Sequence, residues 1–346
     1  MKTLKKIVCL ALALALSLSL FACGGGKTTL NVLNWGDYID PELLRQFEDE
    51  TGIKVKYTTM TSNEEMLVKL ASPDNIYDVC FPSDYIIEKL VADDLLYAID
   101  KSNIPNLSNI DPRFLDLSFD PGNTYSVPYM WGTVGILYNT TMVSDPVDSW
   151  NILWNEKYAG EILMYDSMRD TIGITLKKLG YDINTRNEAD VLAAQEALIE
   201  QKPLVRAYLT DDIKMELING SAAMGVVYSG DAVYCIEENP DLAYAVPMEG
   251  SNVWFDNIII PKTSQHTAEA EAFINFLCDA DVAAQNSEYI GYSTPNAAAL
   301  AIMGPDYTDD PTYNPPQDVL DRCQIFEDLG DFVKVFSDAW TKVKAA

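Results

Sequence analysis

A strand–helix–strand pattern near the start of the chain is the feature that most narrows its fold. Residues 30–35 predict a strand, Asp40-Pro41 opens a helix that ends at Gly52, and apolar residues alternate over 53–57 as in a second strand. Two strands joined by a helix within about thirty residues form a βαβ unit, which requires a parallel sheet with helices on its faces. The chain is therefore expected to begin as an open α/β domain.

A second round of the same pattern follows directly. Residues 62–70 predict a helix with Ser62 as its cap and Glu65 as the partner in a capping box, and Asp78–Phe81 predicts the next strand. The α/β organisation thus extends beyond the first unit.

Later segments show where this organisation changes. Residues 125–138 predict short strands rich in glycine and aromatic residues, and a new α/β region begins at about Trp150, so we expect a lobe boundary between them. Farther on, residues 225–228 and 253–260 predict buried strands, and residues 268–277 predict a helix.

The first 22 residues form a unit of their own. Three lysines precede an apolar run from Ile7 to Leu20, which is too short for a comfortable membrane span and is typical of a secretory signal. The sequence Leu20-Phe21-Ala22-Cys23 resembles the lipobox of bacterial lipoproteins, which implies cleavage before a lipid-modified Cys23 and a tether over residues 23–29. The alternative is a plain secretory signal in which Cys23 is incidental.

The rest of the chain is expected to be a soluble body of about two domains of roughly 150 residues each. Its 52 acidic and 24 basic residues give a net charge of −28, which repels nucleic acid and anionic lipid and favours cationic partners. An acidic surface that serves only solubility is the equally simple alternative.

Signatures of common enzymes are largely missing from the sequence. His266 is the only histidine, and no nucleophile elbow, phosphate-binding loop or zinc-protease motif occurs. Of the six cysteines, Cys9 belongs to the signal segment and Cys23 to the lipobox-like sequence, and the other four are widely spaced and lack a CxxC pair. We therefore expect no metal or other cofactor and buried thiols at Cys80 and Cys278, while the sequence leaves open whether any disulfide forms among Cys80, Cys235, Cys278 and Cys323. We therefore expect a chain that is not an enzyme, with a glycosidase-type pair of carboxylates as the alternative.

Aromatic residues and carboxylates recur together where the predicted strands end. The four segments are Trp35-Gly36-Asp37-Tyr38, Ser83-Asp84-Tyr85, Tyr228-Ser229-Gly230-Asp231 and Trp254-Phe255-Asp256. Ligands of open α/β sheets bind at the carboxyl ends of the strands. Because aromatic faces attract organic cations and carboxylates pair with ammonium groups, a cleft lined by both would suit an elongated amine. Taken singly, each aromatic residue is also a candidate for the core.

A family resemblance covers nearly the whole mature chain. The segments that carry it are Asn34–Tyr38, Glu50–Val55, Ser62–Glu64, Phe81–Tyr85, Tyr125–Gly132, Trp254–Asp256 and Ile290–Asn296. Together they resemble the bacterial spermidine/putrescine-binding proteins of ABC transporters, a polyamine-binding family of the periplasmic solute-binding type.

The resemblance implies a two-lobed periplasmic-binding-protein fold of type II, with a mainly parallel sheet flanked by helices in each lobe and a hinge between the lobes. Residues 30–136 plus 256–303 would form lobe 1, and residues 137–255 plus 304–346 would form lobe 2. The chain would cross between the lobes near residues 135–138 and 252–254. It also implies a monomer that passes its polyamine to the transmembrane subunits of an ABC permease.

The resemblance also implies a set of ligand-binding positions: Trp35, Asp37, Tyr38, Ser83, Tyr85, Asp170, Thr210, Tyr228, Trp254, Asp256 and Tyr292. The tryptophans and tyrosines would hold methylene groups and ammonium faces, while Asp256 and Asp170 would pair with buried nitrogens. The simpler alternatives are a turn cap for Asp256 and a solvated charge beside Arg169 for Asp170.

Departures from the family pattern bear on the choice of ligand. Ser167 stands where the family's spermidine binder has a second acid, Tyr228 replaces a tryptophan, and Phe326 replaces a glutamine. Fewer acids would suit a diamine better than a triamine, unless Asp37, Asp166 or Glu327 supplies the missing charge. A sugar or iron binder of related fold is the other alternative, and the lone histidine disfavours iron.

Overall fold

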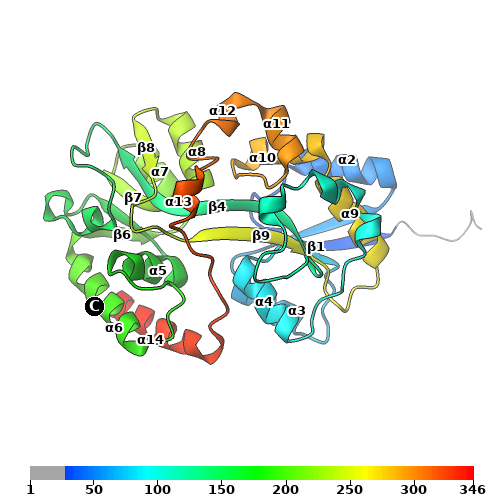
Figure 1. The fold of residues 1–346 in the computed structure, drawn as a ribbon, viewed down its shortest axis with the longest axis horizontal. Coiled ribbons are helices and arrows are strands. Elements are labelled where there is room, and N and C mark those ends of the chain that lie inside the picture. The colour runs from blue at the N-terminus through cyan, green and yellow to red at the C-terminus, as the bar shows by residue number, and fades with distance from the viewer. Residues whose placement is uncertain (1–27) are drawn as a thin grey trace, which may run out of the picture.

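The structure is a computed structural model that describes residues 28–346. Within these residues, strands form a nine-stranded sheet in the order β2-β1-β3-β9-β4-β7-β5-β6, with β8 paired to β4 (Figure 1). The strands are β1 (Thr29–Trp35), β2 (Lys54–Met60), β3 (Val79–Cys80), β4 (Ser126–Asn139), β5 (Ile162–Tyr165), β6 (Val205–Leu209), β7 (Met224–Tyr228), β8 (Leu242–Ala245) and β9 (Val253–Ile259).

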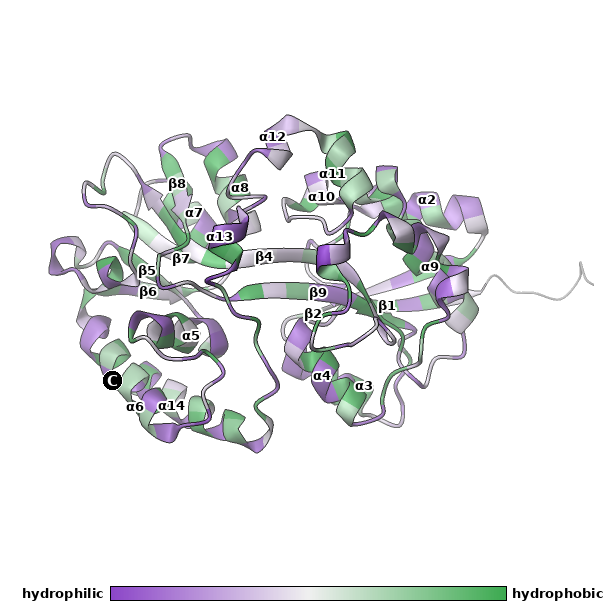
Figure 2. Cartoon of the chain, in the orientation of Figure 1, coloured by the Kyte–Doolittle hydropathy of each residue, from purple (hydrophilic) through white to green (hydrophobic). Residues whose placement is uncertain are grey.

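Helices flank the sheet and connect its strands. The α-helices are α2 (Pro41–Thr51), α3 (Asn63–Leu70), α4 (Asp84–Ala92), α5 (Met168–Lys178), α6 (Glu188–Gln201), α7 (Asp212–Ile218), α8 (Ser229–Glu238), α9 (Thr267–Leu277), α10 (Ala280–Ile290), α11 (Ala297–Met303), α12 (Pro305–Thr308), α13 (Gln317–Leu320) and α14 (Val333–Ala345). Short 3-10 helices span Lys101–Asn103, Pro105–Asn109, Pro112–Phe114, Trp150–Trp154, Glu156–Tyr158, Lys202–Leu204 and Gly330–Phe332. Figure 2 shows helices that mix hydrophobic and hydrophilic residues, as expected when one face packs on a sheet.

The predicted βαβ unit at the start of the chain is confirmed. Strands β1 and β2 pair in parallel along their whole length, and α2 connects them. The side chain of Asp40 caps α2 by accepting a hydrogen bond from the amide of Glu42. The helix ends at Gly52, whose φ of +74° lies in the left-handed region that glycine adopts without strain.

The second round is confirmed with two differences. The hydroxyl of Ser62 caps α3 by accepting from the amide of Glu65 at 3.1 Å, as predicted. The carboxylate of Glu65, however, accepts from the amide of Thr61 at 2.8 Å, so it reaches one residue farther back than a capping box would. Strand β3 has only two residues, which makes it shorter than the predicted strand.

Strand β4 is the main departure from the predicted elements. Residues 126–139 form one strand of 14 residues, so the prediction of several short strands is wrong. Its glycines permit close approach instead of ending strands, because a Cβ at Gly132 would lie 2.6 Å from Oγ of Ser229 and one at Gly135 would lie 2.5 Å from the ring of Tyr244. The strand pairs with β9 as far as Thr133 and with β7 from Val134 onward.

Strands β4 and β9 run between two groups of elements (Figure 1). We call these groups the β1 side, which holds β1, β2, β3, α2, α3, α4 and α9, and the β7 side, which holds β5, β6, β7, α5, α6 and α14. Each side contains a parallel set of three strands, β2-β1-β3 or β7-β5-β6, and β4 and β9 join them with antiparallel pairing.

The chain passes between the sides once more near its C-terminus. The hydroxyl of Tyr313 accepts a hydrogen bond from the amide of Thr294 at 3.2 Å and shares another with the hydroxyl of Ser287, so residue 313 still packs on the loops that follow α10 and its side of the sheet. Helix α14 instead packs on α5 and α6. The third passage therefore falls between residues 314 and 333.

The cysteines of residues 28–346 are all free. Cys80 and Cys278 are buried, as predicted, and burial raises the pKa of both thiols. Among these residues, no helix is both long enough and apolar enough to cross a membrane. The predicted signal segment and Cys23 lie outside the described part of the chain.

Candidate ligand-binding site

Most of the predicted binding residues converge where strands of both sides end. They come from the β1–α2 loop (Tyr38), the start of α4 (Ser83, Tyr85), the first turn of α5 (Asp170), the end of β7 (Tyr228), β9 (Trp254, Asp256) and the loop between α10 and α11 (Tyr292). This is the strand edge at which open α/β sheets bind ligands.

Asp256 is a buried carboxylate held by hydroxyl groups. It is 7% exposed, and it accepts hydrogen bonds from the hydroxyl of Tyr38 at 2.7 Å and from that of Ser83 at 2.6 Å. Burial raises the pKa of Asp256 to about 6, and the two hydrogen bonds limit the rise. Within residues 28–346 it forms no ion pair, so its charge is left uncompensated in an environment where charge is costly.

Asp170 is a second buried carboxylate, on the β7 side. It is 5% exposed and accepts hydrogen bonds from the hydroxyls of Tyr228 at 2.8 Å and Ser167 at 2.6 Å, and from the side-chain amide of Asn252 at 3.4 Å. The burial excludes a merely solvated charge. Its place in the first turn of α5 also favours a negative charge there.

Four aromatic rings connect these two carboxylates. The ring of Tyr38 lies 5.7 Å from that of Tyr292, which lies 5.3 Å from Trp254, which in turn lies 5.9 Å from Tyr228, all edge to face. We call these four residues the aromatic row. Its first member donates to Asp256 and its last donates to Asp170. The indole nitrogen of Trp254 is buried without a hydrogen-bond partner among the described residues, although such groups are usually paired.

Tyr85 and Arg169 meet across the two sides. Arg169 is 6% exposed, and its guanidinium carbon lies 5.4 Å from the ring centroid of Tyr85 and 4.3 Å from that of Phe326. The guanidinium donates to the carbonyl of Glu327 at 3.2 Å, and burial lowers the pKa of Arg169. This contact was not predictable from the sequence, because cation–π pairing depends on which side chains the fold brings together.

Three predicted residues lie apart from the aromatic row. Asp37 is exposed, with a φ of +47°, and Thr210 is exposed in the turn before α7; neither side chain forms a hydrogen bond with the row. Trp35 is half-buried, and its indole nitrogen donates to the carbonyl of Phe81 at 2.9 Å. The structure thus brings eight of the eleven predicted positions into the contacts described above. The other three lie outside those contacts.

Two further carboxylates belong to this region and were not predicted as site residues. Asp84 is 1% exposed and accepts hydrogen bonds from the amides of Tyr85 at 2.7 Å and Phe255 at 3.0 Å. Asp231 is 9% exposed and pairs with Lys214 at 3.2 Å. Both stood in the aromatic–acid segments of the sequence, so that pattern could have found them.

Asp84 predicts a pH dependence of stability. Burial raises the pKa of Asp84 to about 8 against an ordinary 3.8, so the folded chain holds a proton that the unfolded chain releases. The contribution of Asp84 to the stability of the folded protein is fully present below pH about 4 and is lost as the pH rises toward 8. We expect the thermal midpoint of the ligand-free protein to fall as the pH is raised through this window. In Asp84→Asn the fall should be smaller, whatever the midpoint itself. Thermal unfolding followed by circular dichroism at a series of pH values checks this, and equal slopes would contradict it.

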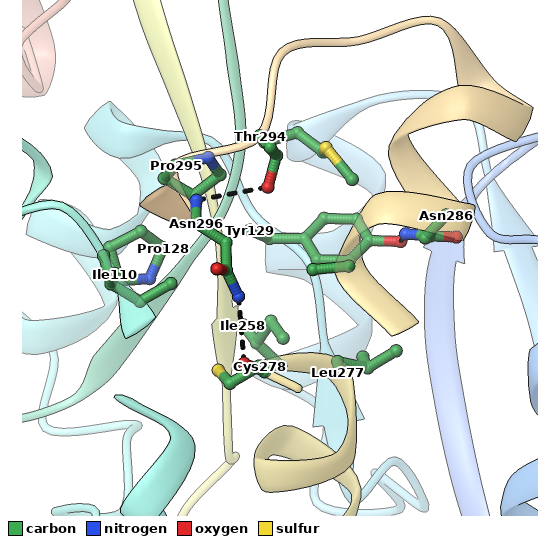
Figure 3. A pocket seen from close by; sticks show the side chains of 12 residues that line it. Ile110, Pro128, Tyr129, Ile258, Leu277, Cys278, Asn286, Thr294, Pro295 and Asn296 are labelled. Atoms are coloured by element: carbon green, nitrogen blue, oxygen red, sulfur yellow. Dashed lines mark hydrogen bonds between the residues drawn. The ribbon is translucent and has the colours of Figure 1, made fainter. Parts of the chain in front are cut away.

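Two cavities of the structure are lined by residues other than those of the aromatic row. The one in Figure 3, of about 10 Å³, lies on the β1 side among Tyr129, Asn286, Ile258 and Asn296, and has the size of a single water. A second, of about 170 Å³, is lined by Phe114, Trp131 and the residues around them. The rings of the row pack edge to face against one another at centroid distances of 5.3–5.9 Å. No cluster of acidic, histidine or cysteine side chains suited to a metal occurs within residues 28–346.

Comparisons with known proteins identify the relatives of this chain. Residues 42–315 match the family described as bacterial extracellular solute-binding protein. The spermidine/putrescine-binding periplasmic protein of Salmonella typhimurium is 37% identical over 320 residues, which cover 92% of each chain.

Two solved structures are similar over almost their whole length. A spermidine/putrescine ABC transporter protein of Listeria monocytogenes shares 41% identity with a TM-score of 0.88, over 92% of this chain and 99% of that one. The spermidine/putrescine ABC transporter substrate-binding protein of Streptococcus pneumoniae shares 40% identity with a TM-score of 0.83, over the same shares. The predicted α/β class and two-lobed type II architecture are thereby confirmed.

Proposed function

Because the chain belongs to the bacterial extracellular solute-binding proteins, we propose that it binds putrescine, spermidine or both outside the cytoplasm and delivers them to an ABC permease for uptake. The family is one of transport proteins, and we propose that this member performs no catalysis.

One observation supports the ligand class above all others. Two buried carboxylates, Asp256 and Asp170, lie at opposite ends of the aromatic row, and neither has an ion-pair partner within residues 28–346. A polyamine offers what this arrangement lacks: ammonium groups to pair with the carboxylates, and methylene groups to lie along the rings. The pairing would offset the cost of two buried charges.

The same geometry disfavours the two alternatives. A neutral sugar would leave Asp256 without a counter-charge, and it would leave Asp170 with only the neighbouring Arg169, with which it forms no ion pair. A glycosidase needs two carboxyl groups on either side of one bond, whereas here the tyrosines that hold them are separated by three ring-to-ring steps of 5.3–5.9 Å.

The proposal includes a hinge between two lobes. Lobe 1 would comprise residues 30–136 plus 256–303, and lobe 2 residues 137–255 plus 304–346, with β4 and β9 as crossing strands. The hydrogen bonds of Tyr313 favour moving the last boundary to about residue 315. Closure would bring together Tyr85 and Arg169, as well as Tyr292 and Tyr228, from opposite lobes.

We further propose that the chain acts as a monomer anchored to the membrane through a lipid on Cys23. The support is the lipobox-like sequence Leu20-Phe21-Ala22-Cys23 and the three glycines that follow it. The transmembrane subunits of the permease would be the partner.

Isothermal titration of the protein without its signal, refolded to remove carried-over ligand, tests the ligand class. We expect heat and saturation with putrescine, spermidine or both, and none with a panel of sugars or with ferric citrate. A sugar response together with silence toward both amines would overturn the proposal.

A further inference from the structure

A third acid, Asp231, lies against the aromatic row and is already paired with the ammonium group of a lysine. The carboxylate of Asp231, in the first turn of α8, pairs with Nζ of Lys214 at 3.2 Å. Among the ion pairs of residues 28–346, its side chain is the most buried acid, at 12% exposure. Burial raises the pKa of Asp231, and Lys214 opposes that rise.

Two observations place this pair beside the site. Burial and the nearby carboxylate of Asp231 raise the pKa of the hydroxyl of Tyr292, which lies in the middle of the row. The ring of Tyr292 also rests on the residue before Asp231, since a Cβ at Gly230 would lie 2.2 Å from that ring. Asp231 is thus held against the row at a point between Asp256 and Asp170, the two carboxylates without an ion pair among the described residues.

The surroundings of Lys214 are those of an ammonium-binding site. Burial opposes its charge, but the carboxylates of Asp231 and Asp211 outweigh burial and raise the pKa of Lys214. An ammonium paired with a buried acid beside the aromatic row is also what the ligand itself would present to Asp256 or Asp170. The difference is that this ammonium belongs to the protein.

Other acids do not supply a third free carboxylate here. Asp166 is exposed and pairs with Lys344 at 2.8 Å, and Glu327 is exposed. Asp84 accepts hydrogen bonds from two backbone amides. Besides Asp84, the site therefore has two carboxylates without an ion pair within residues 28–346, Asp256 and Asp170, and a third, Asp231, that pairs with Lys214.

We propose that Lys214 fills a third ammonium subsite and thereby makes the cleft selective for a diamine over a triamine. This inference rests on the proposed polyamine function. Lys214 occupies the carboxylate of Asp231 and repels other cations. A third ammonium group of the ligand would therefore meet a like charge there instead of a free carboxylate.

The test is the ratio of spermidine to putrescine affinity, measured by isothermal titration for the wild type and for variants. Lys214→Met removes the charge of the lysine and keeps the approximate length of the side chain. It should shift the ratio toward spermidine by about tenfold, because spermidine would gain one charge-assisted contact with Asp231, partly offset by the cost of desolvating its ammonium group. Lys214→Gln, which can still hydrogen-bond to Asp231, should shift the ratio in the same direction and serves if the methionine variant does not fold.

Two controls separate selectivity from stability. The double variant Lys214→Met with Asp231→Asn removes the acid that a third ammonium would use, so its ratio should return toward that of the wild type. Lys157→Met breaks an ordinary exposed ion pair with Asp145 at 2.8 Å and should leave the ratio unchanged.

Three outcomes would overturn the inference. An unchanged ratio in folded Lys214→Met or Lys214→Gln would mean that the pair only ties α7 to α8, while the polyamine function would stand. A shift that persists in the double variant would exclude Asp231 as the acceptor. A wild type that binds neither amine would remove the proposed function, and this inference with it.

Discussion

Replacing Asp256 with asparagine is expected to weaken putrescine binding by at least about 100-fold, because truncating one partner of a buried charge pair costs on the order of 3 kcal/mol. The protein should still fold. The hydroxyls of Tyr38 and Ser83 now donate to the carboxylate, and either can rotate to accept from the new amide instead. Titration calorimetry gives the affinity, and thermal unfolding shows whether the variant is folded.

A matched variant separates the loss of a ligand contact from the loss of a buried acid. Asp120 is 2% exposed and accepts hydrogen bonds from the amides of Tyr125 and Ser126 at 2.9 and 2.8 Å, away from the aromatic row. Asp120→Asn should lower stability and leave putrescine affinity intact. If both variants bind putrescine as the wild type does, Asp256 is not a ligand residue.

The same carboxylate predicts how binding depends on pH. With a pKa of about 6, Asp256 takes up a proton in the ligand-free protein as the pH falls below that value, and an ammonium ligand must displace it. The putrescine affinity of the wild type should therefore drop between about pH 7 and 5. The decrease should be smaller in Asp256→Asn, because that position no longer titrates.

Trp254→Leu is the second change with a large expected effect. It removes the central π face of the aromatic row, which should lower putrescine affinity by roughly 30-fold, since a desolvated cation–π contact contributes about 2 kcal/mol. Leucine keeps part of the volume, whereas Trp254→Ala would also empty a position that is 8% exposed and cost about 3–5 kcal/mol of stability. Calorimetric titration and thermal unfolding of both variants separate these effects.

Trp150 provides the control for this prediction. It is fully buried, its indole nitrogen donates to the carbonyl of Gly250 at 2.8 Å, and its ring lies outside the aromatic row. Trp150→Leu should reduce the thermal midpoint without reducing affinity in proportion. Equal losses of affinity in Trp150→Leu and Trp254→Leu would mean that the row acts only as core.

Local patterns in the sequence determined the elements that depend on neighbouring residues. The cap of α2 at Asp40, its end at Gly52 and the cap of α3 at Ser62 were all predictable, because each involves backbone groups within a few positions. The buried strands β7 and β9 followed from continuous apolar runs. The convergence of aromatic and acidic residues also followed, because strand ends of a parallel sheet meet at one edge.

Only the tertiary structure decided which of these residues touch one another. Tyr38 and Asp256 are 218 positions apart, and Asp170 and Tyr228 are 58 apart, so no local pattern pairs them. The single strand β4 could not be foreseen for the same reason, since its glycines are explained by Ser229 and Tyr244 packing against them from elsewhere in the chain.

Asp231 shows most clearly what the sequence determined and what only the tertiary structure decided. The sequence placed Asp231 after a buried strand beside an aromatic residue, which marked it as a candidate like the others. Whether such an acid is open to a ligand depends on the nearest cation, and Lys214 reaches it from a different helix. Composition and spacing determine which charged groups a site can contain, but their compensation depends on distances of a few ångströms that only the packed chain defines.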